Sequence, residues 1–149
     1  RDKINSLDEK IKNLLIIRSI FDGILIVNDD ISLVKYCDGF HLGQSDLLLF
    51  SNDKSRAISI IRKTIGDKIL GLSTHNRDEI LEANSLNLNY IGLGAYRDTS
   101  TKKDIDTIIG NQATQLAKLS KHKVALIGGV KMSDNIDNVT YSVVCSNLL

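Results

Sequence analysis

Several short segments of this sequence carry polar side chains suited to phosphate and metal chemistry. Asp29 and Asp46 are carboxylates, the groups that Mg²⁺ binds together with water and substrate phosphate. Asp is also a frequent helix cap, so capping is the alternative role for both residues. The run Thr99-Ser100-Thr101-Lys102 places three hydroxyls and an ammonium within four residues. That composition fits either an anion site or a solvated loop.

Glycine and histidine residues add candidates that are equally open. Gly128-Gly129 would let the backbone approach a ligand closely, but a tight left-handed turn explains the pair almost as well. His75, two residues after Ser73, could be a general acid or base, or a helix-capping or surface group. His41 lies within a predicted strand and is expected to be structural. His122, between two lysines, is expected to be a solvated loop residue.

Composition narrows the class of protein. The 19 basic and 18 acidic side chains nearly cancel, which argues against a nucleic-acid-binding surface. No apolar run approaches the roughly 20 residues of a membrane span. The two cysteines, Cys37 and Cys145, match no metal or redox spacing, so free thiols in a reducing cytoplasm are expected. The sequence begins at Arg1 without a methionine, so we expect it to be part of a longer chain.

Short β-rich apolar runs alternate with amphipathic stretches along the chain. Their apolar residues are continuous rather than alternating, which is typical of strands covered on both faces in a parallel sheet. Six strands are predicted on this basis: Ile24–Val27, Gly39–Leu42, Ile69–Leu72, Tyr90–Leu93, Val124–Ile127 and Ser142–Cys145.

Helices are predicted between these strands. Ser6 and Glu9 form a capping-box pattern, and the apolar stripe that follows predicts a helix that ends near Arg18. Asn76 and Glu79 repeat the signature. Two more helices are expected around 57–61 and over 105–119. The order predicts one α/β domain over residues 1–149, either an open doubly wound sheet or a barrel lacking two strands.

In both folds ligands collect at the carboxyl ends of the strands, where nearly every predicted strand delivers polar or glycine residues. The sequence resembles the thiamine phosphate synthase family, because its segments come in that family's order and near that family's spacing. Five segments carry the resemblance, which covers essentially the whole chain: 25–30 (LIVNDD), 38–46 (DGFHLGQSD), 71–76 (GLSTHN), 90–94 (YIGLG) and 127–130 (IGGV).

The resemblance implies a fold and a reaction. The fold is a TIM (β/α)₈ barrel, of which this sequence covers about strands three to eight, with the first two strands absent. The reaction couples hydroxymethylpyrimidine diphosphate with thiazole phosphate, giving thiamine phosphate and pyrophosphate. In the family's mechanism pyrophosphate leaves first and the thiazole nitrogen captures the resulting cation. The implied cofactor is Mg²⁺, and the implied partners are small phosphorylated substrates, with a homo-oligomer left open.

The resemblance also assigns residue roles. Asp29 and Asp46 would bind Mg²⁺. The catalytic residues would be Arg1, Lys3, Ser73 and Lys102. The substrate-binding residues would be Arg1, Lys3, Asn28, Ser73, Thr99, Thr101, Lys102, the Gly129 backbone, Cys145 and Ser146.

One segment departs from the family. Gly94-Ala95-Tyr96-Arg97-Asp98 lacks two prolines that usually precede the Thr-x-Thr-Lys loop, and their loss is expected to loosen it. Two alternatives therefore remain. One is a thiazole tautomerase-like enzyme of the same superfamily, in which His75 transfers protons. The other is a non-catalytic protein that binds a phosphorylated ligand.

Overall fold

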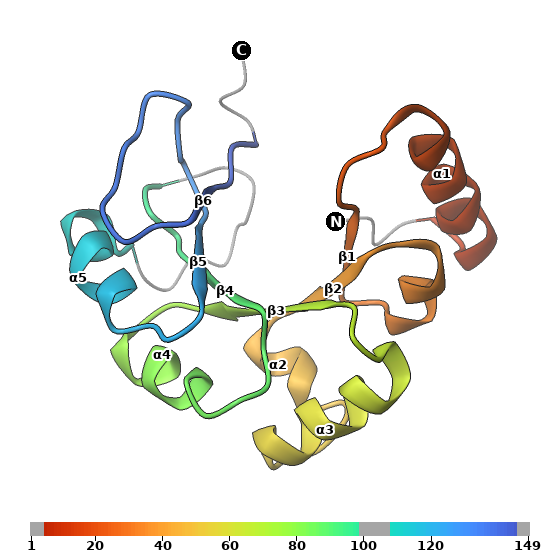
Figure 1. Ribbon diagram of the computed structural model, residues 1–149, viewed down its shortest axis with the longest axis horizontal. Helices are drawn as coiled ribbons and strands as arrows, with labels where there is room; N and C mark the ends of the chain where they lie inside the picture. Colours follow the sequence, from red (N-terminus) through yellow and green to blue (C-terminus); the bar gives the residue numbers. More distant parts are fainter. Residues whose placement is uncertain (1–4, 99–107, 146–149) are drawn as a thin grey trace. The chain divides into compact units, whose positions relative to one another are not determined.

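The computed structural model describes residues 5–98 and 108–145 and consists of two compact units, Arg1–Leu70 and Gly71–Leu149 (Figure 1). Strand β3 crosses the boundary between them. Within the parts of the chain that the structure describes, no helix is long and apolar enough to span a membrane.

The first unit begins with the predicted capping box. The Glu9 N–H donates to Ser6 Oγ at 3.4 Å, and the Ser6 N–H donates to Glu9 Oε2 at 2.8 Å, which satisfies two donors at the start of the helix. The helix runs two residues past Arg18. The elements of this unit are α1 (Leu7–Ile20), β1 (Ile26–Asn28), η1 (Ile31–Tyr36), β2 (Gly39–Leu42), α2 (Gln44–Leu47) and α3 (Lys54–Ile65).

Strands β1 and β2 pair in parallel, and Asn28 at the end of β1 lies opposite His41. Strand β3 starts beside β2, because the Ile69 N–H donates to the Asp38 carbonyl at 3.0 Å. Phe40 and Leu42 of β2 are fully buried, as is Leu47 of α2. The core of this unit therefore lies around β2.

The second unit continues the parallel arrangement, with β3 paired to β4, β4 to β5 and β5 to β6. Leu72, Ile91, Leu93 and Leu126 are buried at these pairings. The predicted parallel α/β class is therefore confirmed. The elements are β3 (Ile69–Thr74), α4 (Arg77–Ala83), β4 (Tyr90–Leu93), η2 (Gly110–Gln112), α5 (Ala113–Lys118), β5 (Lys123–Leu126) and β6 (Tyr141–Ser142).

Several predicted bounds differ from the structure. Strand β1 starts at Ile26 rather than Ile24, whose side chain is 65% exposed. Strand β3 extends to Thr74 because Thr74 is fully buried and its hydroxyl donates to the Gly92 carbonyl at 3.1 Å. Of the helix expected over 105–119, residues 105–107 lie outside the described ranges. The rest is divided between η2 and α5, and Gly110 has a positive φ of 45°.

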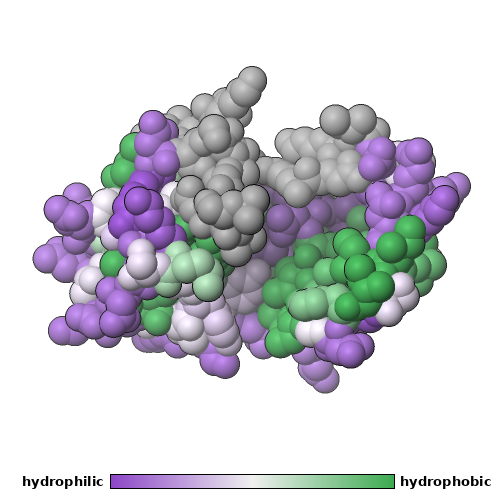
Figure 2. Space-filling view, turned by 90° about the horizontal axis from the view of Figure 1, so that it is seen from above, coloured by the Kyte–Doolittle hydropathy of each residue, from purple (hydrophilic) through white to green (hydrophobic). Residues whose placement is uncertain are grey.

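Apolar side chains also remain exposed on the first unit. They lie on α1 and just after it, and Figure 2 shows hydrophobic residues gathered in one patch on the side where Figure 1 places α1. A contiguous exposed patch of this kind ordinarily marks a surface that is covered by something else. The exposed apolar residues of α1 and of the segment just after it are Leu7, Leu15, Ile16, Ile17, Ile20, Phe21 and Ile24.

Candidate active site

The carboxyl ends of β1 and β2 place the two predicted metal-binding carboxylates at one edge. Asp29 directly follows β1, and its N–H donates to the His41 carbonyl of β2 at 3.0 Å. Asp46 lies in the first turn of α2, just after the end of β2. Asn28 is the last residue of β1 and is exposed there. The first unit thus brings Asn28, Asp29 and Asp46 to the carboxyl ends of two adjacent parallel strands.

The backbone separates Asp29 from its neighbour Asp30. Asp30 caps η1, since its Oδ1 accepts the Ser32 N–H at 3.2 Å and the Ser32 hydroxyl at 2.6 Å. Asp29 adopts a φ of 65°, in the left-handed region that non-glycine residues seldom occupy. A residue held in that region at a strand end is a reason to look for a functional role. Capping therefore accounts for Asp30, and Asp29 is the candidate ligand.

Asp46 takes part in a cap as well. Its Oδ2 accepts the Gly43 N–H at 2.8 Å, which closes the first turn of α2. A carboxylate has about four acceptor positions on two oxygens, so this bond leaves capacity for a cation. The capping role considered for Asp46 is therefore present and is compatible with metal binding.

The donor set can be compared with what a metal requires. In residues 5–98 and 108–145 no group of three or more His, Cys, Asp or Glu side chains is arranged to hold a metal ion. That excludes a closed structural site of the zinc type within those ranges. Mg²⁺ needs only one or two protein carboxylates and otherwise takes water and phosphate oxygens. Asp29 and Asp46 fit Mg²⁺ in number and in chemistry.

In the second unit, the end of β3 holds Ser73 and His75. Ser73 is the next-to-last residue of β3 and is partly exposed. His75 follows the strand, and its Nδ1 lies 2.9 Å from Glu79 Oε2, an oxygen that also accepts the His75 N–H at 2.8 Å. A carboxylate at Nδ1 favours the tautomer that carries the proton there, which leaves Nε2 as the nitrogen that can accept a proton. His75 thus has the partner that a proton-transfer residue needs.

The segment that lacks the two prolines, Gly94 to Asp98, forms backbone hydrogen bonds with two neighbouring segments. The Tyr96 and Arg97 N–H groups each donate at 2.9 Å, to the carbonyls of Ile127 and Gly128. On the other side, the Ala95 carbonyl accepts the Ile109 N–H at 2.9 Å. These hydrogen bonds hold residues 94–98 in place. The Thr-x-Thr-Lys loop that is expected to loosen, residues 99–102, lies outside the described ranges, so that expectation stays a prediction.

Gly128 and Gly129 form the turn that follows β5, with φ angles of 87° and 66°. A side chain at either position would collide with the segment after β4. A Cβ on Gly128 would lie 2.8 Å from the Ala95 Cβ, and one on Gly129 would lie 2.8 Å from the Arg97 Cβ. Both glycines are therefore required by the left-handed turn and by close packing. The close packing explains why residue 129 is glycine but does not test whether its backbone binds a ligand, so that role stays a prediction.

Several predicted site residues lie outside the described ranges: Arg1, Lys3, Thr99, Thr101, Lys102 and Ser146. Cys145 is described and is an exposed free thiol, whereas Cys37 is buried. The thiols expected from the sequence are therefore present as predicted.

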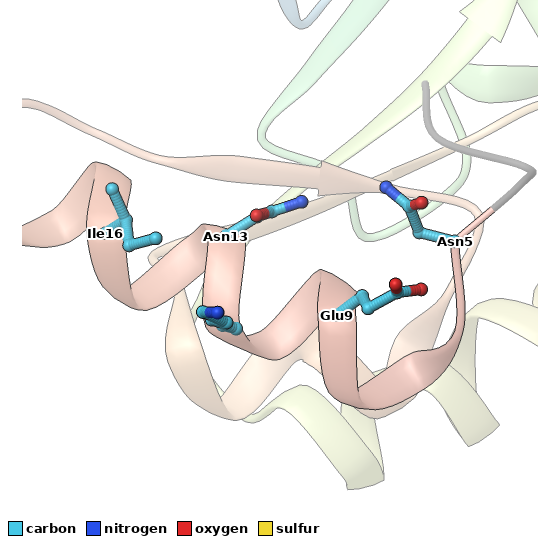
Figure 3. A pocket seen from close by; sticks show the side chains of 5 residues that line it. Asn5, Glu9, Asn13 and Ile16 are labelled. Carbon is cyan, nitrogen blue, oxygen red and sulfur yellow. The ribbon is translucent and has the colours of Figure 1, made fainter.

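No predicted site role falls on the side chains of the other two histidines or on a surface pocket. His41 lies in β2, as expected for a structural role. His122 lies in the loop before β5, as expected, but it is only partly exposed and its Nε2 lies 2.9 Å from the Ala83 carbonyl. A pocket along α1 is lined by Asn5, Glu9, Lys12, Asn13 and Ile16 (Figure 3). None of its residues is a predicted site residue.

Sequence reasoning missed two partnerships in the second unit. Glu79 was identified only as a capping residue, although its spacing of four from His75 on a helix start is a signal for contact. Arg97 forms an ion pair with Asp134 at 2.5 Å. Those two residues are 37 positions apart, and no local pattern joins them.

Comparison with known proteins places the chain in a family. Residues 2–144 match the family model described as thiamine monophosphate synthase. The thiamine-phosphate synthase of Methanosarcina mazei is 38% identical over 136 residues, which are 87% of this chain and 53% of that protein. The Methanosarcina barkeri enzyme is 34% identical over 163 residues, covering 99% of this chain and 70% of that protein. The Clostridium botulinum thiamine-phosphate synthase is 41% identical over 109 residues, which are 71% of this chain and 47% of that protein.

The fold has a solved counterpart. Thiamine phosphate pyrophosphorylase from Pyrococcus furiosus matches with a TM-score of 0.66 at 22% identity, over 88% of this chain and 61% of that one. The chain spans about half the length of the first two curated relatives. The family match covers nearly all of the sequence, and the parallel α/β fold agrees with it. The chain therefore belongs to the thiamine monophosphate synthase family.

Proposed function

We propose that the full-length protein is a thiamine phosphate synthase, a transferase that couples hydroxymethylpyrimidine diphosphate with thiazole phosphate and releases pyrophosphate. The names of its relatives support this activity. The observation that carries it is the placement of Asp29 and Asp46 after adjacent parallel strands, β1 and β2. A diphosphate leaving group needs its growing negative charge neutralised, and two carboxylates at one strand edge supply a place for the cation that does so.

In this proposal Asp29 and Asp46 hold Mg²⁺, which supplies positive charge to the departing diphosphate. Asn28, exposed at the end of β1, positions the pyrimidine substrate beside it. Arg1 and Lys3 bind the diphosphate. Positioning matters because two substrates must meet with their reacting atoms aligned.

The remaining roles fall on the later part of the chain. Ser73, at the end of β3, contacts pyrophosphate, and Lys102 bridges toward it. Thr99 and Thr101 bind the thiazole phosphate. The backbone of Gly129, Cys145 and Ser146 completes the phosphate site, at the position that barrel enzymes commonly use for phosphate.

We further propose that residues 1–149 form one domain and supply strands three to eight of a (β/α)₈ barrel in the full-length protein. The parallel pairing of β3 to β6 in chain order supports this. The exposed apolar patch of α1 supports it too, since such a surface is ordinarily covered. The proposed location is the cytoplasm, where phosphorylated intermediates and reduced thiols occur.

The proposed metal site is tested by paired substitutions at neighbouring carboxylates. Asp46→Asn and Asp29→Asn in the full-length protein should each lower thiamine phosphate formation at least about a hundredfold, because an amide is a poor ligand for Mg²⁺. Asp30→Asn is the matched control: Asp30 is adjacent to Asp29 but caps η1, and Asn caps equally well. Equal activity in all three variants would contradict the metal site.

The His75–Glu79 pair favours one second function, proton transfer in a thiazole tautomerase. The pair has the geometry for it, with Nδ1 held at 2.9 Å. His75→Gln should then abolish interconversion of thiazole phosphate tautomers, and Glu79→Gln should slow it. Thiamine phosphate formation by His75→Gln at the wild-type rate, with no tautomerase activity in the wild type, would exclude this second function.

A further inference from the structure

Arg97 and Asp134 form an ion pair that joins the segment after β4 to the loop after β5. Nη1 and Nη2 of Arg97 reach the two carboxylate oxygens of Asp134 at 2.5 and 2.8 Å. Two parallel hydrogen bonds fix the orientation of both planes as well as their separation. Asp134 also accepts the Lys131 N–H at 2.8 Å, which ties the carboxylate to its own loop. The pair therefore holds the two segments in one defined arrangement.

Arg97 also holds two consecutive peptide groups of the turn after β5. Its backbone N–H donates to the Gly128 carbonyl at 2.9 Å, and its Nη1 donates to the Gly129 carbonyl at 2.9 Å. In a trans peptide the N–H points opposite to the C=O of the same plane. The two carbonyls face Arg97, so the N–H groups of Gly129 and Val130 point the other way. One residue thus sets the direction of two neighbouring backbone donors.

The guanidinium itself is oriented from a further side. It lies over the Tyr96 ring, 4.2 Å from the ring centroid, and Nη2 is 3.3 Å from the Tyr96 hydroxyl. Tyr96 is only 9% exposed, so the ring is a fixed platform. A planar guanidinium can stack and donate in its plane at once, which an ammonium cannot do. Lysine at this position could not make the same set of contacts.

We infer that Arg97, acting with Asp134, is a positioning residue for substrate phosphate at the Gly128-Gly129 turn. This inference rests on the proposed function, which assigns the phosphate of the thiazole substrate to the Gly129 backbone. Neighbouring N–H groups bind an anion well only when they are aimed at one point. The Arg97–Asp134 ion pair orients these N–H groups from outside the site and does not contact the substrate.

The first unit offers a matched control. Arg18 Nη2 lies 2.5 Å from Asp38 Oδ2, and Arg18 Nη1 donates to the Gly23 carbonyl at 2.9 Å. Asp38 also accepts the Leu25 N–H at 2.8 Å, as Asp134 accepts that of Lys131. Asp38 precedes β2, at the amino end of the strand, where ligands do not bind in this class of fold. Asp38→Asn therefore weakens a similar ion pair at the opposite end of a strand.

The test compares Asp134→Asn, Arg97→Lys and Asp38→Asn in the full-length protein. Asp134→Asn and Arg97→Lys should raise the KM for thiazole phosphate by on the order of tenfold, while the KM for the diphosphate substrate stays within about twofold. Asp38→Asn should leave both KM values unchanged, although its melting temperature falls as much as that of Asp134→Asn. A purely structural role predicts equal kinetics for Asp134→Asn and Asp38→Asn, and that result would overturn the inference.

A binding measurement separates this inference from the proposed function. Calorimetric titration with inorganic phosphate should give a Kd about tenfold higher for Asp134→Asn than for the wild type or Asp38→Asn. If the wild type makes no thiamine phosphate, the proposed function fails, but a Kd difference still supports the positioning role. Equal Kd values in wild type and Asp134→Asn, or no phosphate binding by the wild type, would overturn it.

Discussion

Replacing Gly129 by alanine tests the close packing of the turn after β5 against the segment after β4. Gly129 has a φ of 66°, a region that costs an L-residue about 1–2 kcal/mol. The new Cβ would lie 2.8 Å from the Arg97 Cβ and 3.1 Å from the Asp98 carbonyl oxygen, well inside the roughly 3.5–4.0 Å of a favourable carbon contact. Relieving such overpacking costs about 1–3 kcal/mol. The expected loss in the free energy of unfolding is therefore about 2–5 kcal/mol.

Gly110→Ala isolates the conformational part of that cost. Gly110 also has a positive φ, 45°, but a Cβ there would meet no heavy atom within 4 Å. Its substitution should cost only about 1–2 kcal/mol. The assay is urea unfolding with the slope m compared between variants, so that changes in the midpoint report stability. If Gly129→Ala were no less stable than Gly110→Ala, the close contact with Arg97 would be refuted.

Three further predictions concern single side chains. Asp29→Gly removes a non-glycine residue from a φ of 65° and should leave the free energy of unfolding unchanged or higher by up to about 1 kcal/mol, while thiamine phosphate formation is lost. The Arg97 hydrogen bonds hold the pKa of Asp134 at about 2 instead of 3.8, so the ionised carboxylate stabilises the fold above its ordinary pKa and this stabilisation is lost as pH falls toward 2. Urea unfolding at about pH 5 and about pH 2.5 should therefore show a smaller acid-induced loss in the free energy of unfolding for Asp134→Asn than for the wild type. Burial raises the pKa of Tyr90 to about 12, so absorbance titration should show this tyrosine ionising last. The Cβ introduced by Gly71→Ala would overlap the Tyr90 ring, so this substitution should displace the ring and bring its pKa back toward 10.

The elements that local patterns specify could be predicted well. Strands β2 and β4 have the predicted bounds, because each is a short run of apolar residues buried on both faces. Helices α1 and α4 begin at the N-caps Ser6 and Asn76, as predicted, since a cap depends on neighbours three residues away. Strand β1 was misplaced at its start because Ile24 is apolar but exposed, and hydropathy alone does not report burial.

The candidate site was predictable only in part, for a physical reason. Convergence of Asp29 and Asp46 at one strand edge follows from parallel pairing, which the sequence pattern predicted. The contacts that hold the second unit's loops depend on residues distant in sequence. Arg97 meets Asp134 and His122 meets Ala83 through the fold, so neither contact has a local signal.

The most direct test of the proposed function is a single stoichiometric assay on the full-length protein. Hydroxymethylpyrimidine diphosphate, thiazole phosphate and Mg²⁺ are supplied together, and thiamine phosphate and pyrophosphate are quantified in the same samples. We predict equal amounts of the two products, and neither product when either substrate is omitted. Pyrophosphate released without thiamine phosphate, or no turnover by a folded protein, would contradict the assignment as a synthase.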